Sequence, residues 1–143
     1  MKIHFVIDKT VKAQVFKKSI IQRYENYSPV QSNVIVVIGG DGFMLETLKK
    51  YRKYKRPFYG MNKGTFGFLM NKFKTKNIKQ SISKAKSVTI SPLEMHAITK
   101  DNIKKSAIAI NEVSLFRQSK QAASLQILNG KKILIKKLIG DGV

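Results

Sequence analysis

A run of β-branched residues that ends at a glycine-rich turn constrains the fold of this chain more than any other feature. Residues 34–38 are all valine or isoleucine, and Gly-Gly-Asp-Gly follows them directly at residues 39–42. Continuous apolar runs of this kind are typical of strands that lie buried in a parallel sheet. Residues 43–54 are predicted to form a helix, so the sequence predicts a strand, a sharp turn and a helix in succession.

The same turn is a candidate phosphate-binding site. Glycines allow a sharp turn and let bare backbone N–H groups come close to a ligand, and the start of a helix carries the positive end of the helix dipole. Asp41 is the unexpected member, because a carboxylate weakens an anion site unless it has another task, such as accepting a proton or holding a metal. The structural alternative is that Asp41 caps the helix in an ordinary tight turn.

The first part of the chain alternates predicted strands with predicted helices. Apolar spacing and chain breakers place strands at residues 2–8, 34–38 and 58–61, and helices at residues 10–24 and 43–54. This alternation indicates a parallel α/β sheet, in which ligands bind beyond the carboxyl ends of the strands. The glycine-rich turn lies at one such end.

The second part of the chain changes character. After a short helix at residues 77–86, strand-like patterns occupy residues 88–90, 95–100, 106–110, 113–116, 124–128 and 131–137. Asn129-Gly130, between the last two, is a strong hairpin signal. We therefore predict the α/β class, with a parallel, Rossmann-like, three-layer domain over residues 1–91 and the start of an antiparallel β domain over residues 92–143. That β domain looks incomplete, because few elements follow the hairpin to cover its sheet.

Composition narrows the function classes. The chain has no cysteine, which excludes disulfides and thiolate metal sites. It has no apolar run of the roughly 20 residues that a membrane span needs, and its first residues resemble a strand more than a signal peptide. We therefore expect a cytoplasmic protein with no membrane partner. Neither His4 nor His96 has neighbours at metal-ligand spacing, so no residue is predicted as a metal ligand.

The net charge of +20 permits binding to polyanions, from nucleic acids to phosphate-rich small molecules. The basic residues are mostly lysines spread along the whole chain. The densest cluster, residues 49–56, carries tyrosines at a spacing that favours packing. Charge of this kind produces non-specific attraction at low salt. We expect no specific nucleic-acid partner.

Residues 62–69 form a second candidate segment for ligand contacts. They follow the third predicted strand, so they should face the same crevice as Asp41. Asn62 can donate and accept hydrogen bonds, and Phe68 can stack on a flat base. The alternative is an ordinary turn with Phe66 and Phe68 in the core.

Asn111 and Glu112 place two adjacent polar residues between apolar runs. Burying them unpaired would cost on the order of 1–3 kcal/mol, so they need partners. A ribose diol is a suitable partner, because Glu accepts hydrogen bonds from both hydroxyls and Asn fixes the orientation. The alternative is a turn between two strands.

Together these segments resemble the NAD kinases, which phosphorylate the 2′-hydroxyl of the adenosine ribose of NAD to make NADP. Residues 39–42 look like the family's Gly-Gly-Asp-Gly motif, and residues 62–69 look like its Asn-x-Gly-x-x-Gly-Phe-Leu segment. Asn111-Glu112 matches its Asn-Glu pair, and residues 140–142 resemble the Asp-Gly that opens a later glycine-rich stretch. Gly-Gly-Asp-Gly is shared with the diacylglycerol and sphingosine kinases, so the other three segments carry the distinction.

The resemblance implies a role for each segment. Asp41 would be the general base that takes the proton from the ribose hydroxyl, and Phe68 would contact the adenine. The implied substrate-binding residues are Gly39, Gly40, Asp41, Gly42, Asn62, Phe68, Asn111, Glu112 and Asp141. The resemblance further implies ATP or polyphosphate as donor, a divalent metal such as Mg²⁺ or Mn²⁺ bound with ATP, and a homo-oligomer, either a dimer or a tetramer.

Two departures from the family pattern matter. Phe43 stands where the family usually has Thr, which removes a hydroxyl near the phosphates. The family also continues past the second Asp-Gly, where this sequence stops at Val143. We therefore expect the chain to be the amino-terminal half of the family fold, with a partial NAD-binding β domain and little activity by itself. The alternatives are a non-catalytic nucleotide-binding module and a lipid kinase relative that shares Gly-Gly-Asp-Gly.

Overall fold

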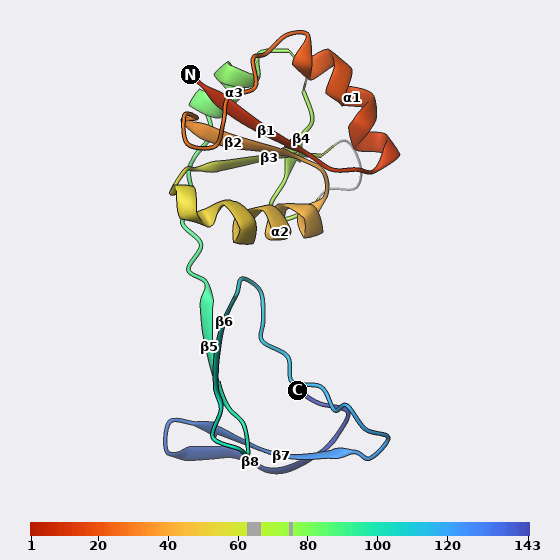
Figure 1. Cartoon of the computed structure of the whole chain (residues 1–143), viewed down its shortest axis with the longest axis vertical. Coiled ribbons are helices and arrows are strands. Elements are labelled where there is room, and N and C mark those ends of the chain that lie inside the picture. Colours follow the sequence, from red (N-terminus) through yellow and green to blue (C-terminus); the bar gives the residue numbers. More distant parts are fainter. Residues whose placement is uncertain (63–66, 75) are drawn as a thin grey trace. The chain divides into compact units, whose positions relative to one another are not determined.

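The structure, a computed structural model, describes residues 1–62, 67–74 and 76–143. The backbone contacts divide the chain into two compact units, Met1–Val88 and Thr89–Val143 (Figure 1). Each unit is described by itself below. The domain boundary expected near residue 91 stays a prediction. No helix in the described part of the chain is long and apolar enough to cross a membrane.

The first unit is a three-layer α/β domain. Its sheet has four parallel strands in the order β1 (Ile3–Ile7), β2 (Val34–Ile38), β3 (Phe58–Asn62) and β4 (Asn71–Lys72). Helices α1 (Val11–Ile21) and α3 (Ile78–Ser83) cover one face, and α2 (Asp41–Tyr51) covers the other (Figure 1). A short 3₁₀ helix, η1 (Arg52–Tyr54), continues α2.

Strand β2 is the centre of the hydrophobic core. All five of its residues are buried, with at most 3% of their surface exposed. Successive side chains of a strand point to opposite faces, so Val34, Val36 and Ile38 pack on the α1 and α3 side. Ile35 and Val37 pack on the α2 side with Met44. The uninterrupted β-branched run is therefore explained by helices on both faces.

The predicted elements of this unit are confirmed with shifted ends. The expected parallel α/β class is present, and β2 has the predicted bounds. The helix predicted at residues 43–54 begins two residues earlier, at Asp41, and its last turn is the 3₁₀ helix. Strand β4 was not predicted, because two polar residues, Asn71 and Lys72, give no apolar pattern.

The second unit consists of antiparallel strand pairs, as expected. Strand β5 (Leu93–Ile98) pairs with β6 (Lys104–Ala109), and β7 (Ala123–Asn129) pairs with β8 (Lys132–Gly140). The predicted hairpin is confirmed. Gly130, the first of its two loop residues, has a φ of +59°, a conformation that favours glycine.

Two strands predicted from residue 88 onward are wrong. Residues 88–90 form no regular element, and they pair with no described strand. Residues 113–116 contribute only an isolated bridge between Phe116 and Gly142. Apolar, β-branched composition is not sufficient for a strand, because the backbone also needs a neighbouring strand along its whole length.

Residues 89–143 contain no buried residue. Apolar side chains on their strands stay largely exposed, including Ile98 at 67% and Ile139 at 62%. Isolated two-stranded hairpins are marginally stable in water. The folding free energy of this chain therefore resides mainly in the first unit, whose core is closed.

The burial of β2 leads to a stability prediction. Ile35→Ala removes a fully buried side chain (0% exposed) and should lower the free energy of unfolding by about 2–5 kcal/mol. Val11→Ala, at a residue that is 82% exposed, should change it by less than about 0.5 kcal/mol. Urea unfolding followed by far-ultraviolet circular dichroism measures both. Equal midpoints for the two variants would contradict the assigned core.

Candidate active site

Asp41 is the first residue of α2, at the point where β2 ends. The residue that caps the helix is Gly40, with φ −95° and ψ 178°, and no side chain makes a capping hydrogen bond. The carboxylate of Asp41 instead accepts a hydrogen bond at Oδ2 from the backbone N–H of Phe68, at 2.8 Å. The alternative in which Asp41 caps its own helix is therefore wrong.

The hydrogen bond joins two of the candidate segments. Asp41 and Phe68 are 27 residues apart in the chain, and each follows a strand of the parallel sheet. The two segments are therefore neighbours at Asp41 and Phe68; that they face one ligand-binding crevice stays a prediction. Asn62 is the last residue of β3 and is half-buried. Residues 63–66, including Phe66, lie outside the described residues.

Gly67 contacts the Asp41 carboxylate directly. A Cβ atom at residue 67 would lie 2.1 Å from Oδ1 and 2.2 Å from Oδ2 of Asp41, so only glycine fits without displacing the carboxylate. Asp41 is therefore held by the backbone of residues 67 and 68. Steric contact with Asp41 therefore explains why residue 67 is a glycine, which the sequence alone did not reveal.

The other carboxylate oxygen of Asp41 is unsatisfied. Oδ1 is buried, and among the described residues it has no hydrogen-bond partner. An unsatisfied buried acceptor costs on the order of 1–3 kcal/mol, so such an atom requires an explanation. The position of Asp41 in the first turn of α2 offsets part of this cost, since the positive end of the helix dipole favours a negative charge. A proton donor on a ligand would satisfy Oδ1.

The glycine-rich turn does not depend on unusual backbone angles. None of its three glycines has a positive φ. Gly39 has a packing reason, because a Cβ there would lie 2.8 Å from the ring of Phe43. A Cβ on Gly40 or Gly42 would meet no described heavy atom within 4 Å. No described residue therefore blocks a ligand from this side of the two glycines, although the turn itself does not require glycine there.

The rings of Phe43 and Phe68 have different surroundings. Phe43 packs against the core cluster on the α2 side of the sheet, so the residue that replaces the usual Thr has a structural role here. Phe68 is fully exposed (104%), which excludes the alternative that it belongs to the core. Its backbone N–H holds Asp41 while its ring is free to contact a ligand.

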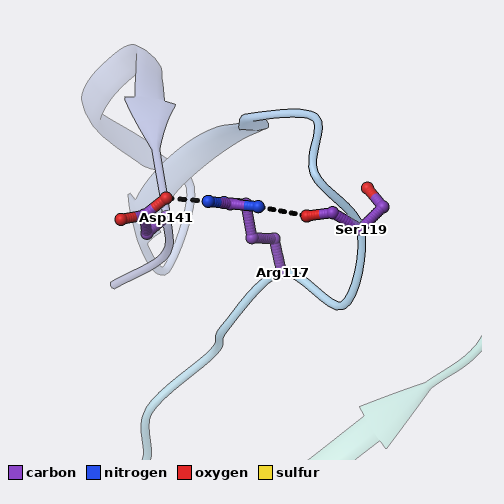
Figure 2. Close-up of polar contacts among 3 residues, drawn as sticks. All are labelled: Arg117, Ser119 and Asp141. Carbon is purple, nitrogen blue, oxygen red and sulfur yellow. Dashed lines mark hydrogen bonds and ion pairs between the residues drawn. The ribbon is translucent and has the colours of Figure 1, made fainter.

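The remaining candidate residues lie in the second unit. Asn111 and Glu112 are exposed; Asn111 lies in a bend shortly after β6, and residues 112–115 form no regular element. Asp141 follows β8 and forms an ion pair with Arg117, whose Nε donates to Oδ1 at 2.5 Å (Figure 2). Sequence reasoning missed Arg117, because no motif or spacing distinguishes it from the other basic residues. A role for these residues in binding a ligand stays a prediction.

No group of three or more His, Cys, Asp or Glu side chains could hold a metal ion in the part of the chain that the structure describes. His4 Nδ1 hydrogen-bonds to the backbone oxygen of Tyr27 at 2.8 Å. His96 Nε2 lies 3.5 Å from Oε2 of the exposed Glu94. These described residues fit a divalent metal only if a bound nucleotide supplies most of the ligands.

Comparisons with known proteins agree with this geometry. The family model described as ATP-NAD kinase N-terminal domain matches residues 6–87. The chain is 42% identical to the NAD kinase of Brucella suis biovar 1 (strain 1330) over 143 residues, which are 100% of this chain and 56% of that protein. It is 42% identical to the NAD kinase of Mesorhizobium japonicum over 141 residues, 99% of this chain and 55% of that protein. It is 37% identical to the NAD kinase of Zymomonas mobilis over 99% of this chain and 56% of that protein. The chain thus spans about half the length of these relatives.

Fold and site together define a class. The chain is an α/β protein of the kind in which a buried parallel strand ends in Gly-Gly-Asp-Gly, with the aspartate at the start of the next helix. Within that class, the ATP-NAD kinase model matches residues 6–87, which are more than half of the chain, and this match identifies the family. The chain belongs to the NAD kinase family.

The contact between Gly67 and Asp41 leads to a prediction about stability. Gly67→Ala should lower the free energy of unfolding by about 1–3 kcal/mol, because the new methyl group displaces the buried carboxylate. Gly42→Ala should leave it unchanged or raise it by up to about 1 kcal/mol, since residue 42 is helical and its surroundings are open. Thermal and urea unfolding compare the two variants. A Gly67→Ala protein as stable as the Gly42→Ala protein would contradict the contact.

Proposed function

We propose that this chain provides the part of an NAD kinase active site that contains Asp41. The complete site transfers a phosphoryl group from ATP or polyphosphate to the 2′-hydroxyl of the adenosine ribose of NAD. The observation that carries the proposal is the hydrogen bonding of the two carboxylate oxygens of Asp41. One carboxylate oxygen is fixed by the Phe68 amide, and the other is buried without a partner. Family membership supports the choice of substrates.

Asp41 acts as the general base. Oδ1 takes the proton of the ribose hydroxyl while the hydroxyl oxygen attacks the terminal phosphorus of the donor, and the bond to the leaving phosphate breaks. Proton transfer to a positioned side chain contributes typically about 10²–10⁴-fold to a rate. The bond from Phe68 fixes the direction of Oδ1, so little reorganisation is needed when the substrate binds.

The glycine-rich turn receives phosphate groups. The open space at Gly40 and Gly42 lets phosphate oxygens approach the backbone, and the start of α2 contributes the positive end of its dipole. A divalent metal such as Mg²⁺ or Mn²⁺, bound mainly through the nucleotide, would neutralise charge on the transferred phosphoryl group. The net charge of +20 attracts substrates that are themselves anionic.

The ligand contacts beyond Asp41 follow the family resemblance. The exposed ring of Phe68 stacks on the adenine, next to the carboxylate that its own amide holds. Asn62 hydrogen-bonds to NAD, and Asn111, Glu112 and Asp141 contribute from the second unit. The protein works in the cytoplasm as a dimer or tetramer, and its other partners are the small molecules NAD and ATP.

Removing the base tests the proposal. Asp41→Asn keeps an oxygen that can accept the Phe68 hydrogen bond but cannot take a proton. NADP formation, measured by enzymatic cycling with NAD, ATP and Mg²⁺, should fall by at least about 100-fold. The dissociation constant for NAD, measured by calorimetry, should change by less than about twofold.

Two results would decide against the kinase. An Asp41→Asn protein that forms NADP as fast as the wild type would show that Asp41 is not the base. NAD binding without any NADP formation, with ATP or polyphosphate, by a chain extended past Val143 to the length of its relatives would favour the non-catalytic nucleotide-binding module.

The open space at Gly42 gives a second test, which separates ligand binding from folding. Gly42→Ala adds a methyl group that meets no described atom of the chain, so the fold should be intact. The methyl group would meet an approaching phosphate, and the KM for ATP should rise by about tenfold or more. Steady-state kinetics and thermal unfolding on the same sample measure both effects. An unchanged KM would show that phosphates do not approach this turn closely.

A further inference from the structure

Arg117 holds Asp141 through both its side chain and its backbone. The guanidinium Nε donates to Asp141 Oδ1 at 2.5 Å, and the backbone N–H of Arg117 donates to the backbone oxygen of Asp141 at 2.8 Å. A second guanidinium nitrogen donates to the backbone oxygen of Ser119 (Figure 2). The side chain therefore bridges the segment after β8 and its own loop.

The backbone around this link is closely paired. Leu115 and Val143 exchange two hydrogen bonds, at 2.7 and 2.9 Å, and Phe116 bridges Gly142 in antiparallel orientation. A Cβ at residue 142 would lie 1.9 Å from the backbone oxygen of Leu115, so only glycine allows this approach. The Asp-Gly pair at residues 141–142 is thus fixed against residues 115–117, although the second unit has no buried residue.

The ion pair affects both the charge and the orientation of the Asp141 carboxylate. The Asp141 side chain is 66% exposed and that of Arg117 is 29% exposed. Exposed ion pairs contribute little to stability, so stabilisation of the fold does not account for this one. The pair does cancel the negative charge of the carboxylate and occupies Oδ1, which leaves Oδ2 as the oxygen available to a hydrogen-bond donor.

We propose that Arg117 is a positioning residue for NAD recognition by Asp141; this inference rests on the proposed function. NAD carries a negatively charged pyrophosphate, which an isolated carboxylate would repel. Paired with Arg117, Asp141 accepts a hydrogen bond from a hydroxyl or amino group of the dinucleotide without adding net negative charge. Arg117 itself need not touch the ligand.

The geometry calls for arginine rather than lysine. Two different guanidinium nitrogens bind Asp141 and Ser119, in the fixed planar arrangement that only arginine offers. A lysine at residue 117 would restore the positive charge but would leave the carboxylate free to rotate. Replacement by lysine therefore separates the two contributions of Arg117, charge and orientation.

Calorimetric titration of the full chain with NAD tests the inference. Arg117→Met should weaken NAD binding by roughly tenfold, and Arg117→Lys should recover only part of that loss. The matched control is Lys120→Met, which removes one positive charge from an exposed residue three positions along the same loop and should bind NAD like the wild type. ATP binding and the thermal midpoint should be the same in all four proteins, a pattern that a purely structural role would not give.

A double-variant cycle shows whether Arg117 acts through Asp141. Adding Arg117→Met to Asp141→Asn should weaken NAD binding no further than the more severe single change. Effects that multiply would overturn the inference, as would full recovery by Arg117→Lys or an unchanged affinity in Arg117→Met. In each of these cases the wild type still binds NAD, so the proposed function is unaffected. If neither this chain nor one extended past Val143 to the length of its relatives binds NAD, the proposed function and this inference are both overturned.

Discussion

Burial of β2 on both faces is the constraint on which the first unit depends. Its five side chains alternate between the core shared with α1 and α3 and the core shared with α2, and none is more than 3% exposed. Because the strand cannot slide without exposing one of these faces, its end is fixed in space. The turn at residues 39–42, the start of α2 and the position of Asp41 follow from that fixed end. A packing requirement in the core thereby determines where the carboxylate proposed as the general base lies.

The hydrogen bonds around Asp41 differ from those of a helix-capping carboxylate. A carboxylate that only capped a helix would use its oxygens on its own first turn. Asp41 is bound instead by the amide of Phe68, which lies in a different loop, and Oδ1 has no partner among the described residues. The chain accommodates this arrangement with a glycine at residue 67, where any side chain would collide with the carboxylate. An unsatisfied buried acceptor needs an explanation, and a ligand is one. The residue whose amide binds Asp41, Phe68, also has a fully exposed ring.

Much of the first unit could be predicted from sequence because its signals are local. A β-branched run and helical apolar spacing predict β2, α1 and α2 within a few residues. Four features were beyond such reasoning. Strand β4 has no apolar pattern, and the helix cap depends on backbone angles at Gly40. The steric reason for Gly67 depends on a residue far away in the chain, as does the ion pair of Arg117. Residues 113–116 show the opposite failure, since a suitable composition forms no strand where the pairing partner is only a few residues long. The ligand contacts assigned to residues such as Asn111 and Glu112 stay predictions.

The two units keep their candidate residues in place by different physical means. In the first, close packing around β2 and α2 fixes the backbone, and a single hydrogen bond then suffices to orient Asp41. In the second, no side chain is buried, so packing cannot fix Asp141. Backbone hydrogen bonds between residues 115–117 and 141–143 fix Asp141 instead, and the guanidinium of Arg117 orients its carboxylate. An exposed ion pair is a weak source of stability but a direct source of orientation, because its geometry acts on the very atoms that would meet a ligand. For this reason we expect a change at Arg117 to alter the binding of NAD and to leave the free energy of folding nearly unchanged.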